Sequence, residues 1–147
     1  MSDLTPKFTE EKMAYIDCFL APVARANRDA YEALARISWE VLKDHGALAV
    51  TECCLDESGP DASTYHGDDA RRESASYGTF VAAAGAQDDE TVVLSWVEWP
   101  DKAARDAGME QVTSDPRMQF GAGPMVFDGA RLVAGGFLPM LRRTAQD

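Results

Sequence analysis

Four segments of this sequence alternate as β-strands do, yet they carry large apolar side chains on both faces. They are residues 13–21, 47–55, 91–99 and the stretch that follows the Asp128–Gly129 turn. In the first segment Ile16 and Leu20 point to one side, while Tyr15 and Phe19 point to the other. A strand that is apolar on both faces has to be covered on both faces. The sheet built from these strands therefore needs two separate coverings.

Two helical segments separate the strands and can supply one covering. The first is expected over 27–44, with Asn27 as its N-cap and Gly46 as its stop. The second is expected to begin after Asp101 and to continue to Val112, although Gly108 weakens it. The resulting order, β-α-β, loop, β-α-β, is typical of the ferredoxin-like split βαβ arrangement. It predicts an α+β fold in which both helices lie on one face of a four-stranded antiparallel sheet.

The second face of that sheet is left without a helix. A bare apolar face of this size is rare on a monomer. The simplest cover is the same face of a second copy, related by a twofold axis. We therefore expect a homodimer in which two sheets close into a dimeric α+β barrel.

The remaining segments place this sheet within one domain. With 147 residues, 46% of them apolar, the chain has the size and composition of a single domain, which we expect over residues 13–143. Residues 1–12 are polar and without periodicity, so they predict a flexible N-terminal arm. Residues 56–87 are rich in Asp, Ser and Gly and predict a long acidic loop, part of which, over 77–84, could return to the sheet as an irregular edge.

The charge of the chain restricts its partners. The sequence has 25 acidic residues against 14 Lys and Arg, a formal charge of −11, and residues 51–100 alone hold eleven acids and two bases. Such a negative field opposes binding to nucleic acids and to anionic membrane surfaces. There is no long apolar run and no secretory signal at the N-terminus, so we expect a cytoplasmic protein. A small, neutral or cationic molecule, or another protein, fits this charge better.

The sequence offers no pattern for a cofactor or a metal ion. The cysteines are an odd set, Cys18, Cys53 and Cys54, without ligand spacing, and are expected to be small buried hydrophobic residues. The glycines form no dinucleotide-binding or phosphate-binding motif. We therefore expect neither a metal nor a cofactor.

Three carboxylates alternate onto otherwise apolar strand faces and are the candidate catalytic residues: Asp17, Glu52 and Glu98. If they converge in the barrel cavity, burial would raise a carboxyl pKa toward the range of a general acid or base. Alternatively, each binds loop amides, Arg or Trp, or pairs across the dimer interface. Glu52 and Glu98 are the stronger candidates because they lie among strongly apolar neighbours.

Four aromatic residues are the candidate lining of a ligand cavity: Tyr15, Phe19, Trp96 and Trp99. Trp96 and Trp99 are three residues apart and so point to opposite faces of their strand. One of them is expected in the core beneath the helices, and the other at the cavity or the dimer contact. An aromatic wall suits a flat apolar ligand, although core packing is the more frequent use of such residues.

Several blocks of the chain resemble a known family. The segments YIDCFLAPVARANRDAY, HGALAVTEC, VVLSWVEWP followed by RDA, SDPRM, and MVFDGARLVAGGF are similar, in order and spacing, to the YbaA-like family of uncharacterised bacterial proteins. The resemblance covers most of residues 13–137. It implies a ferredoxin-like subunit of a dimeric α+β barrel, and it implies no reaction.

Two functions remain open from the sequence. The first is a homodimer that binds a small apolar ligand or another protein, without catalysis. The second is a cofactor-independent enzyme of the monooxygenase-like or isomerase-like kind, in which a strand carboxylate is the acid or base. The second is supported only by analogy at the level of the fold, which hosts many activities. The orientation of Glu52 and Glu98 distinguishes them.

Overall fold

The computed structural model describes residues 14–60, 62–65, 77–119 and 125–147. Its strands and α-helices are β1 (Tyr15–Ala24), α1 (Arg28–Asp44), β2 (Ala49–Cys54), α2 (Phe80–Ala84), β3 (Glu90–Trp99), α3 (Lys102–Ser114) and β4 (Val133–Phe137). Short 3-10 helices add Arg25–Asn27, Ala62–Tyr65, Pro116–Met118 and Gly129–Arg131. The predicted arm, 1–12, and part of the predicted acidic loop lie outside the described residues.

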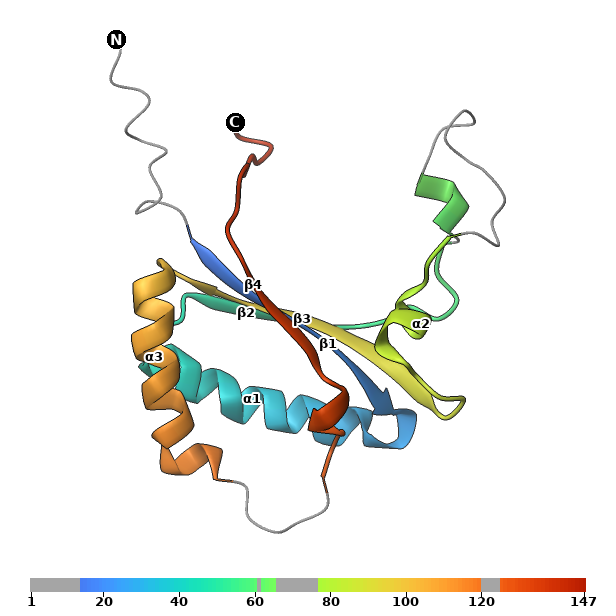
Figure 1. The fold of residues 1–147 in the computed structure, drawn as a ribbon, viewed down its shortest axis with the longest axis horizontal. Coiled ribbons are helices and arrows are strands. Elements are labelled where there is room, and N and C mark those ends of the chain that lie inside the picture. The colour runs from blue at the N-terminus through green and yellow to red at the C-terminus, as the bar shows by residue number, and fades with distance from the viewer. Residues whose placement is uncertain (1–13, 61, 66–76, 120–124) are drawn as a thin grey trace.

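The strands form one antiparallel sheet in the order β2-β3-β1-β4. Helices α1 and α3 lie against one face of this sheet, and α2 lies on the opposite side (Figure 1). The sequence prediction of a mixed α+β fold with a four-stranded antiparallel sheet is thus confirmed. The central strands are β1 and β3, which pair along ten residues.

The core lies between the sheet and the two long helices. Alternate residues of β3 are buried, ending with Trp99, which is fully buried and packs near Ala47 and Val97. Helix α1 contributes Val41, which is also fully buried. Helix α3 starts where Asp101 caps it by accepting a 2.8 Å hydrogen bond from the backbone N–H of Ala104, as the sequence predicts.

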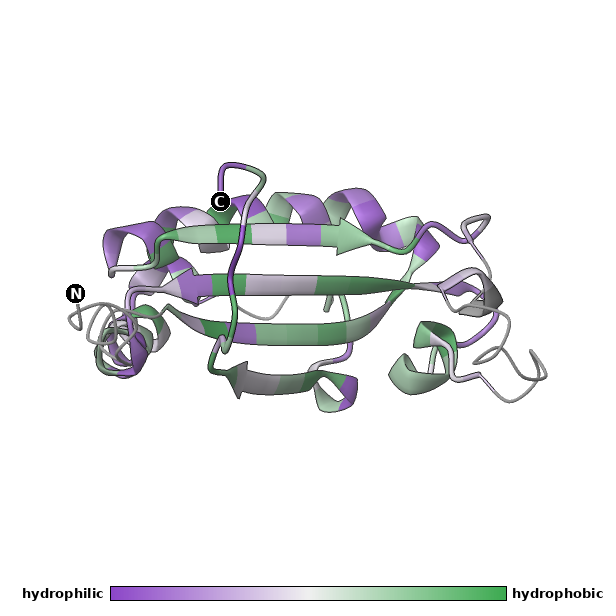
Figure 2. Cartoon of the chain, turned by 90° about the horizontal axis from the view of Figure 1, so that it is seen from above, coloured by the Kyte–Doolittle hydropathy of each residue, from purple (hydrophilic) through white to green (hydrophobic). Residues whose placement is uncertain are grey.

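The face of the sheet away from α1 and α3, here called the uncovered face, carries apolar side chains. Directly paired residues share a face, so the register places these on it: Ile16, Cys18 and Leu20 of β1, Leu94 and Trp96 of β3, and Val133 and Phe137 of β4. Val133 and Phe137 are 51% and 57% exposed. Seen from above, the strands carry long apolar stretches (Figure 2). Helix α2 stands beside this face and packs on β1 and β3.

The prediction that Pro22 ends the first strand is wrong. Strand β1 continues to Ala24, and Pro22 pairs with Val92. Proline cannot donate a ladder hydrogen bond and is tolerated where a strand edge is open. Strand β4 pairs only with residues 16–20 of β1, so Pro22 lies beyond the part of β1 that has a neighbour on both sides.

Two further predictions need correction. Residues 77–84 do not return to the sheet as an edge, because Thr79 caps helix α2 through the N–H of Ala82 and Gly85, at φ +66°, ends it. The cysteines are not all buried: Cys18 and Cys53 are half-buried, and Cys54 is exposed. Cys54 is exposed because it lies on β2, which is an edge strand.

Candidate ligand-binding site

Helix α1 and strand β2 border an open groove of about 570 Å³, here called the outer groove. Charged residues of α1 border it, together with Trp39, Val50 and Cys54. Two of these charges, Arg36 and Glu32, are paired at 2.6 Å one helical turn apart. Most of the charges at the outer groove therefore lie on the helix, and Glu52 on β2 adds one carboxylate.

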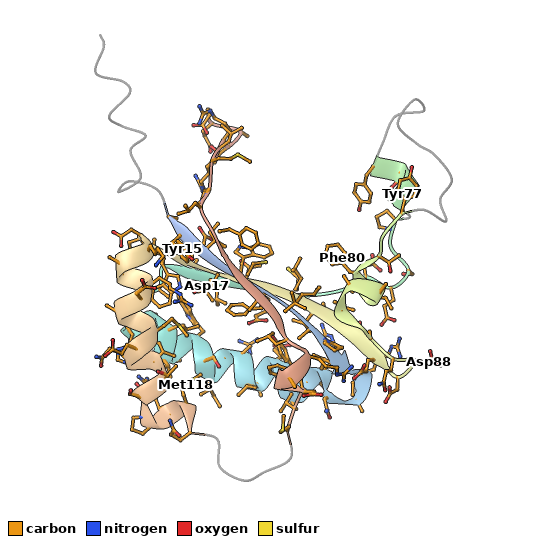
Figure 3. The ribbon with its side chains drawn as sticks, viewed as in Figure 1. Tyr15, Asp17, Tyr77, Phe80, Asp88 and Met118 are labelled. Carbon is orange, nitrogen blue, oxygen red and sulfur yellow. The ribbon has the colours of Figure 1, made fainter. Side chains whose placement is uncertain are left out.

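A second hollow of about 220 Å³ lies between the sheet and the helices and is here called the inner cavity. Its lining is mostly apolar and comes from β1, β2, β3, α1, α3 and the segments before β4; it includes Phe19, Leu34, Val97, Met118, Phe127 and Leu132. Met118 follows α3 and comes to the cavity from below the sheet (Figure 3). An apolar cavity with few polar groups is the usual form of a small-molecule site.

The outer groove and the inner cavity share four lining residues: Tyr31, Ala35, Val50 and Glu52. The hydroxyl of Tyr31 donates a 2.8 Å hydrogen bond to Oε1 of Glu52. Ser95, which is buried, pairs with Glu52 across the two strands and hydrogen-bonds to its carboxylate. These three residues, here called the Tyr31–Glu52–Ser95 cluster, lie where the two hollows meet.

Burial changes the acidity of this cluster. Desolvation raises the pKa of Glu52, while hydrogen bonds from Tyr31 and Ser95 oppose the rise. Because much of Glu52 is exposed toward the groove, water screens part of this effect. The pKa of Tyr31 is raised well above its usual value, first by burial and then by the charge of Glu52. The tyrosine hydroxyl therefore keeps its proton and donates it in a hydrogen bond.

Local structure holds Tyr31 in place. Tyr31 lies on the first turns of α1, and its ring meets that of Phe127 edge to face, with centroids 5.8 Å apart. The segment before β4 is in turn tied to α1, because the side-chain amide of Asn27 donates a 3.0 Å hydrogen bond to the carbonyl of Val126. An edge-to-face aromatic pair is a favourable geometry that fixes the ring.

Asp17, the first predicted carboxylate, lies on the helix side of the sheet but is bound to its own neighbours. The indole N–H of Trp99 donates to Asp17 Oδ2 at 3.1 Å, and Nε of Arg105 donates to the same oxygen at 2.9 Å. Asp17 is 5% exposed. This is the alternative that the sequence left open, in which the carboxylate binds Arg and Trp.

The other predicted residues divide between the two faces. Glu52 faces the groove and the cavity, and Phe19 and Trp99 line the cavity. Trp96 and Glu98 alternate to the uncovered face, where both are half-buried. Asp17 and Glu52 both line the inner cavity, whereas Glu98 lies on the opposite face of the sheet, so the three carboxylates do not converge. Tyr15 lies near Asp17 (Figure 3) and covers Gly136 of β4.

Sequence reasoning missed two members of the cluster. Tyr31 lies on the apolar stripe of its helix, and that pattern by itself indicates packing or a surface anchor rather than a site residue. Ser95 carried a usable signal, since it is a polar residue inside the strongly β-prone segment 91–99. Its partner could not be found without the register that sets Ser95 opposite Glu52.

Neither a metal-binding cluster nor a membrane-spanning helix occurs in the part of the chain that is described. No set of three or more His, Cys, Asp or Glu side chains there is arranged to hold a metal ion. No described helix combines the length and apolarity needed to cross a membrane.

Comparison with known proteins gives the chain its family. Residues 14–129 match the model of a family described as "Protein of unknown function (DUF1428)". Proteins named "Uncharacterized protein YbaA" in Escherichia coli strain K12 and in Shigella flexneri are 35% identical to the chain over 125 residues, which cover 85% of this chain and 95% of each relative. The resemblance to YbaA-like proteins is thereby confirmed, and the chain belongs to the DUF1428 family of proteins of unknown function.

Proposed function

We propose that this protein binds a small, largely apolar molecule between α1 and the sheet. The observation that carries the proposal is the Tyr31–Glu52–Ser95 cluster, which lies where the outer groove meets an apolar cavity. Apolar walls supply most of the binding free energy, and a few fixed polar groups orient the ligand. A ligand with an apolar body and one hydrogen-bond donor, such as an amine, amide or hydroxyl group, matches the Glu52 carboxylate.

The test of binding uses a cavity-filling substitution with a control on the same helix. Ala35 lines both hollows, whereas Ala33 lies on the exposed side of α1. We expect Ala35→Phe to weaken binding of the neutral dye Nile red at least tenfold, and Ala33→Phe to leave it unchanged. Circular dichroism checks that both variants are folded. Equal dye affinity in the wild type and both variants would contradict the proposal.

The natural ligand can be sought directly. Native mass spectrometry of the protein, purified from its own host, should show a bound small molecule as an added mass. Glu52→Gln and Tyr31→Phe remove the charge and the hydroxyl with little change in shape, so we expect each to reduce the bound fraction. Asp106→Asn, on the exposed side of α3, is the matched control. Equal occupancy in all variants would show that the Tyr31–Glu52–Ser95 cluster does not contribute to ligand binding.

The alternative function, proton transfer by an enzyme, is favoured by one observation. Burial raises the pKa of Glu52 beside a tyrosine that retains its proton. Such a carboxylate could take a proton from a bound substrate or return one to it. Incubating the ligand that native mass spectrometry identifies with the wild type and with Glu52→Gln distinguishes catalysis from binding. Conversion by the wild type alone supports catalysis, and an unchanged ligand in both supports simple binding.

We also propose that the protein is a homodimer joined through the uncovered face. The order β4-β1-β3-β2 with two β-α-β units supports a ferredoxin-like subunit. The large apolar residues on this face support its burial in a dimer, because monomers rarely expose such patches. On the adjoining helix α2, Phe80 and Val81 are 52% and 43% exposed.

Light scattering after gel filtration tests the dimer. We expect about twice the mass of the 16.0 kDa chain at micromolar concentration. Phe137→Asp, on the uncovered face, should shift the protein to the monomer, whereas Ile37→Asp, on exposed helix α1, should not. Ile37 is 47% exposed, so its substitution is a fair control. A monomeric wild type would exclude the dimer while leaving the ligand-binding proposal intact.

A further inference from the structure

The ten residues that follow β4, here called the C-terminal tail (138–147), leave the sheet on the side of the uncovered face. In Figure 1 the tail rises away from the sheet on the side opposite α1 and α3, and in Figure 2 it leads across the strands from the β4 edge. It continues directly from Phe137, whose side chain belongs to the uncovered face. The tail and the uncovered face therefore form one continuous surface.

The first part of the tail is apolar, and its large side chains are exposed in the structure as described. Leu138, Met140 and Leu141 are 66%, 96% and 71% exposed. The N–H groups of Thr144, Gln146 and Asp147 donate to acceptors within residues 144–147, and the carbonyl of Arg142 accepts from Nη1 of Arg143. Exposed apolar side chains close together in an extended segment gain free energy when another surface buries them.

The charge of the tail differs from that of the remaining chain. The tail holds Arg142 and Arg143 against Asp147, a side-chain charge of +1. Because the whole chain has a formal charge of −11, the other 137 residues have a charge of −12. A second copy of the chain therefore attracts the tail electrostatically, and such attraction also hastens encounter.

We propose that the C-terminal tail binds the second copy of this chain, so that each protomer of the dimer is held by the tail of the other. The inference rests on the proposed dimer, and it adds a contact outside the two sheet faces. In a twofold dimer the contact is made twice. The occupant is a second copy because the apolar part of the tail adjoins the uncovered face and its basic part matches an acidic chain.

Sedimentation velocity measures the monomer–dimer equilibrium that tests this inference. The double variant Met140→Asp/Leu141→Asp should dimerise at least tenfold more weakly than the wild type. Thr144→Asp/Gln146→Asp adds the same charge to the same tail without removing apolar surface, and should dimerise only slightly more weakly. Thermal unfolding of each variant at dilute concentration checks that the monomer itself is folded.

The outcomes separate the tail from the dimer as a whole. If the wild type is a dimer and the Met140/Leu141 variant dimerises equally well, the tail contact is wrong and the sheet-face dimer stands. If the two double variants weaken the dimer equally, charge alone explains the effect and the apolar contact is wrong. If the wild type is a monomer, both the dimer and the tail contact are wrong.

Discussion

Asp17 joins three elements through one carboxylate. It extends from β1 and accepts two hydrogen bonds, one from the indole N–H of Trp99 on β3 and one from Nε of Arg105 on α3. The hydrogen bond to its carboxylate raises the pKa of Arg105. The residue therefore positions α3 on the sheet; it also lines the inner cavity, where its carboxylate is already held by these two partners.

Replacing Asp17 by asparagine should destabilise the fold. Asp17→Asn keeps the shape of the side chain but removes the charge that faces Arg105, and we expect a loss of roughly 1–3 kcal/mol. Urea unfolding followed by circular dichroism measures the change. Asp106→Asn, which removes a half-exposed partner of the same arginine, should cost less than about 1 kcal/mol. Equal losses in the two variants would contradict the structural role of Asp17.

At this scale the sequence predicted the kinds of residue but not their partners. Alternation correctly directed Trp96 and Trp99 to opposite faces. Asp17 is held by Arg105, which lies 88 residues away in the chain. Local periodicity carries no information about a contact across that separation.

Helix α3 crosses the end of α1 at a position that tolerates no side chain. A Cβ atom added at Gly108 would lie 2.5 Å from the carbonyl oxygen of His45 and 2.5 Å from Cζ3 of Trp99. The sequence suggested that Gly108 weakens this helix. The structure adds that the missing side chain is what lets α3 approach the core closely.

Adding one methyl group at Gly108 should therefore disrupt this contact. We expect Gly108→Ala to lower the free energy of unfolding by about 1–3 kcal/mol through overpacking, despite the better helix propensity of alanine. Gly129→Ala is the control, since nothing lies within 4 Å of the added atom there. Denaturant unfolding compares the two. A Gly108→Ala variant as stable as the wild type would show that α3 can shift away from His45 and Trp99 without loss of stability.

An ion pair that depends on pH joins the segment just before β4 to the start of β3. Arg131 binds Glu90 through two hydrogen bonds of 2.9 and 2.6 Å. This arginine and the backbone N–H of Gln87 lower the pKa of Glu90 from 4.5 to about 2. A carboxyl group whose pKa is lower in the folded state stabilises that state at pH values above its pKa in the unfolded chain. For Glu90 this stabilisation is lost as the pH falls from 4.5 to about 2.

Melting temperatures across this range test the ion pair. Glu90→Gln should melt below the wild type at about pH 7, and the difference should shrink as the pH falls below 4.5 toward 2. Asp89→Asn, at the neighbouring exposed position, should leave the melting temperature nearly unchanged. A difference between Glu90→Gln and wild type that stays constant with pH would show that the charge of Glu90 has no part in it.

The elements themselves were largely predictable from the sequence. Capping residues such as Asp101 and β-branched runs such as that in β3 act locally, so α1, α3 and the strands were found. The wrong predictions concern positions where the extent of a neighbouring strand decides which residue the strand tolerates. Pro22 is tolerated because β4 is short, and the length of one strand is not evident from the sequence of another.

Across the whole molecule, strand pairing is most extensive at the centre of the sheet and least extensive at β4. Strand β3 pairs on both sides, while β4 pairs only with part of β1, and all five of its residues are exposed. Backbone amides in central strands open only with large-scale unfolding, whereas edge amides exchange through local opening. The four strands are therefore expected to differ widely in protection.

Hydrogen exchange followed by mass spectrometry can measure this order. We expect the amides of Val92–Val97 to exchange slowest and those of Val133–Phe137 to exchange fastest at dilute protein concentration. Raising the concentration should slow exchange in β4 if the uncovered face and the tail are buried in a dimer. Uniform protection across the four strands would contradict the ranking of the strands by pairing.

Cys53 and Cys54 are neighbours in the chain, but the alternation of β2 points them to different surroundings. Cys54 lies beside Arg28, whose pKa it raises. Both cysteines border the outer groove, and Cys53 also alternates toward the uncovered face, opposite Leu94. Two identical thiols one residue apart therefore form a pair of built-in reporters. A ligand in the groove should slow alkylation of both thiols, because both cysteines border it, whereas a second subunit on the sheet should slow alkylation of Cys53 alone.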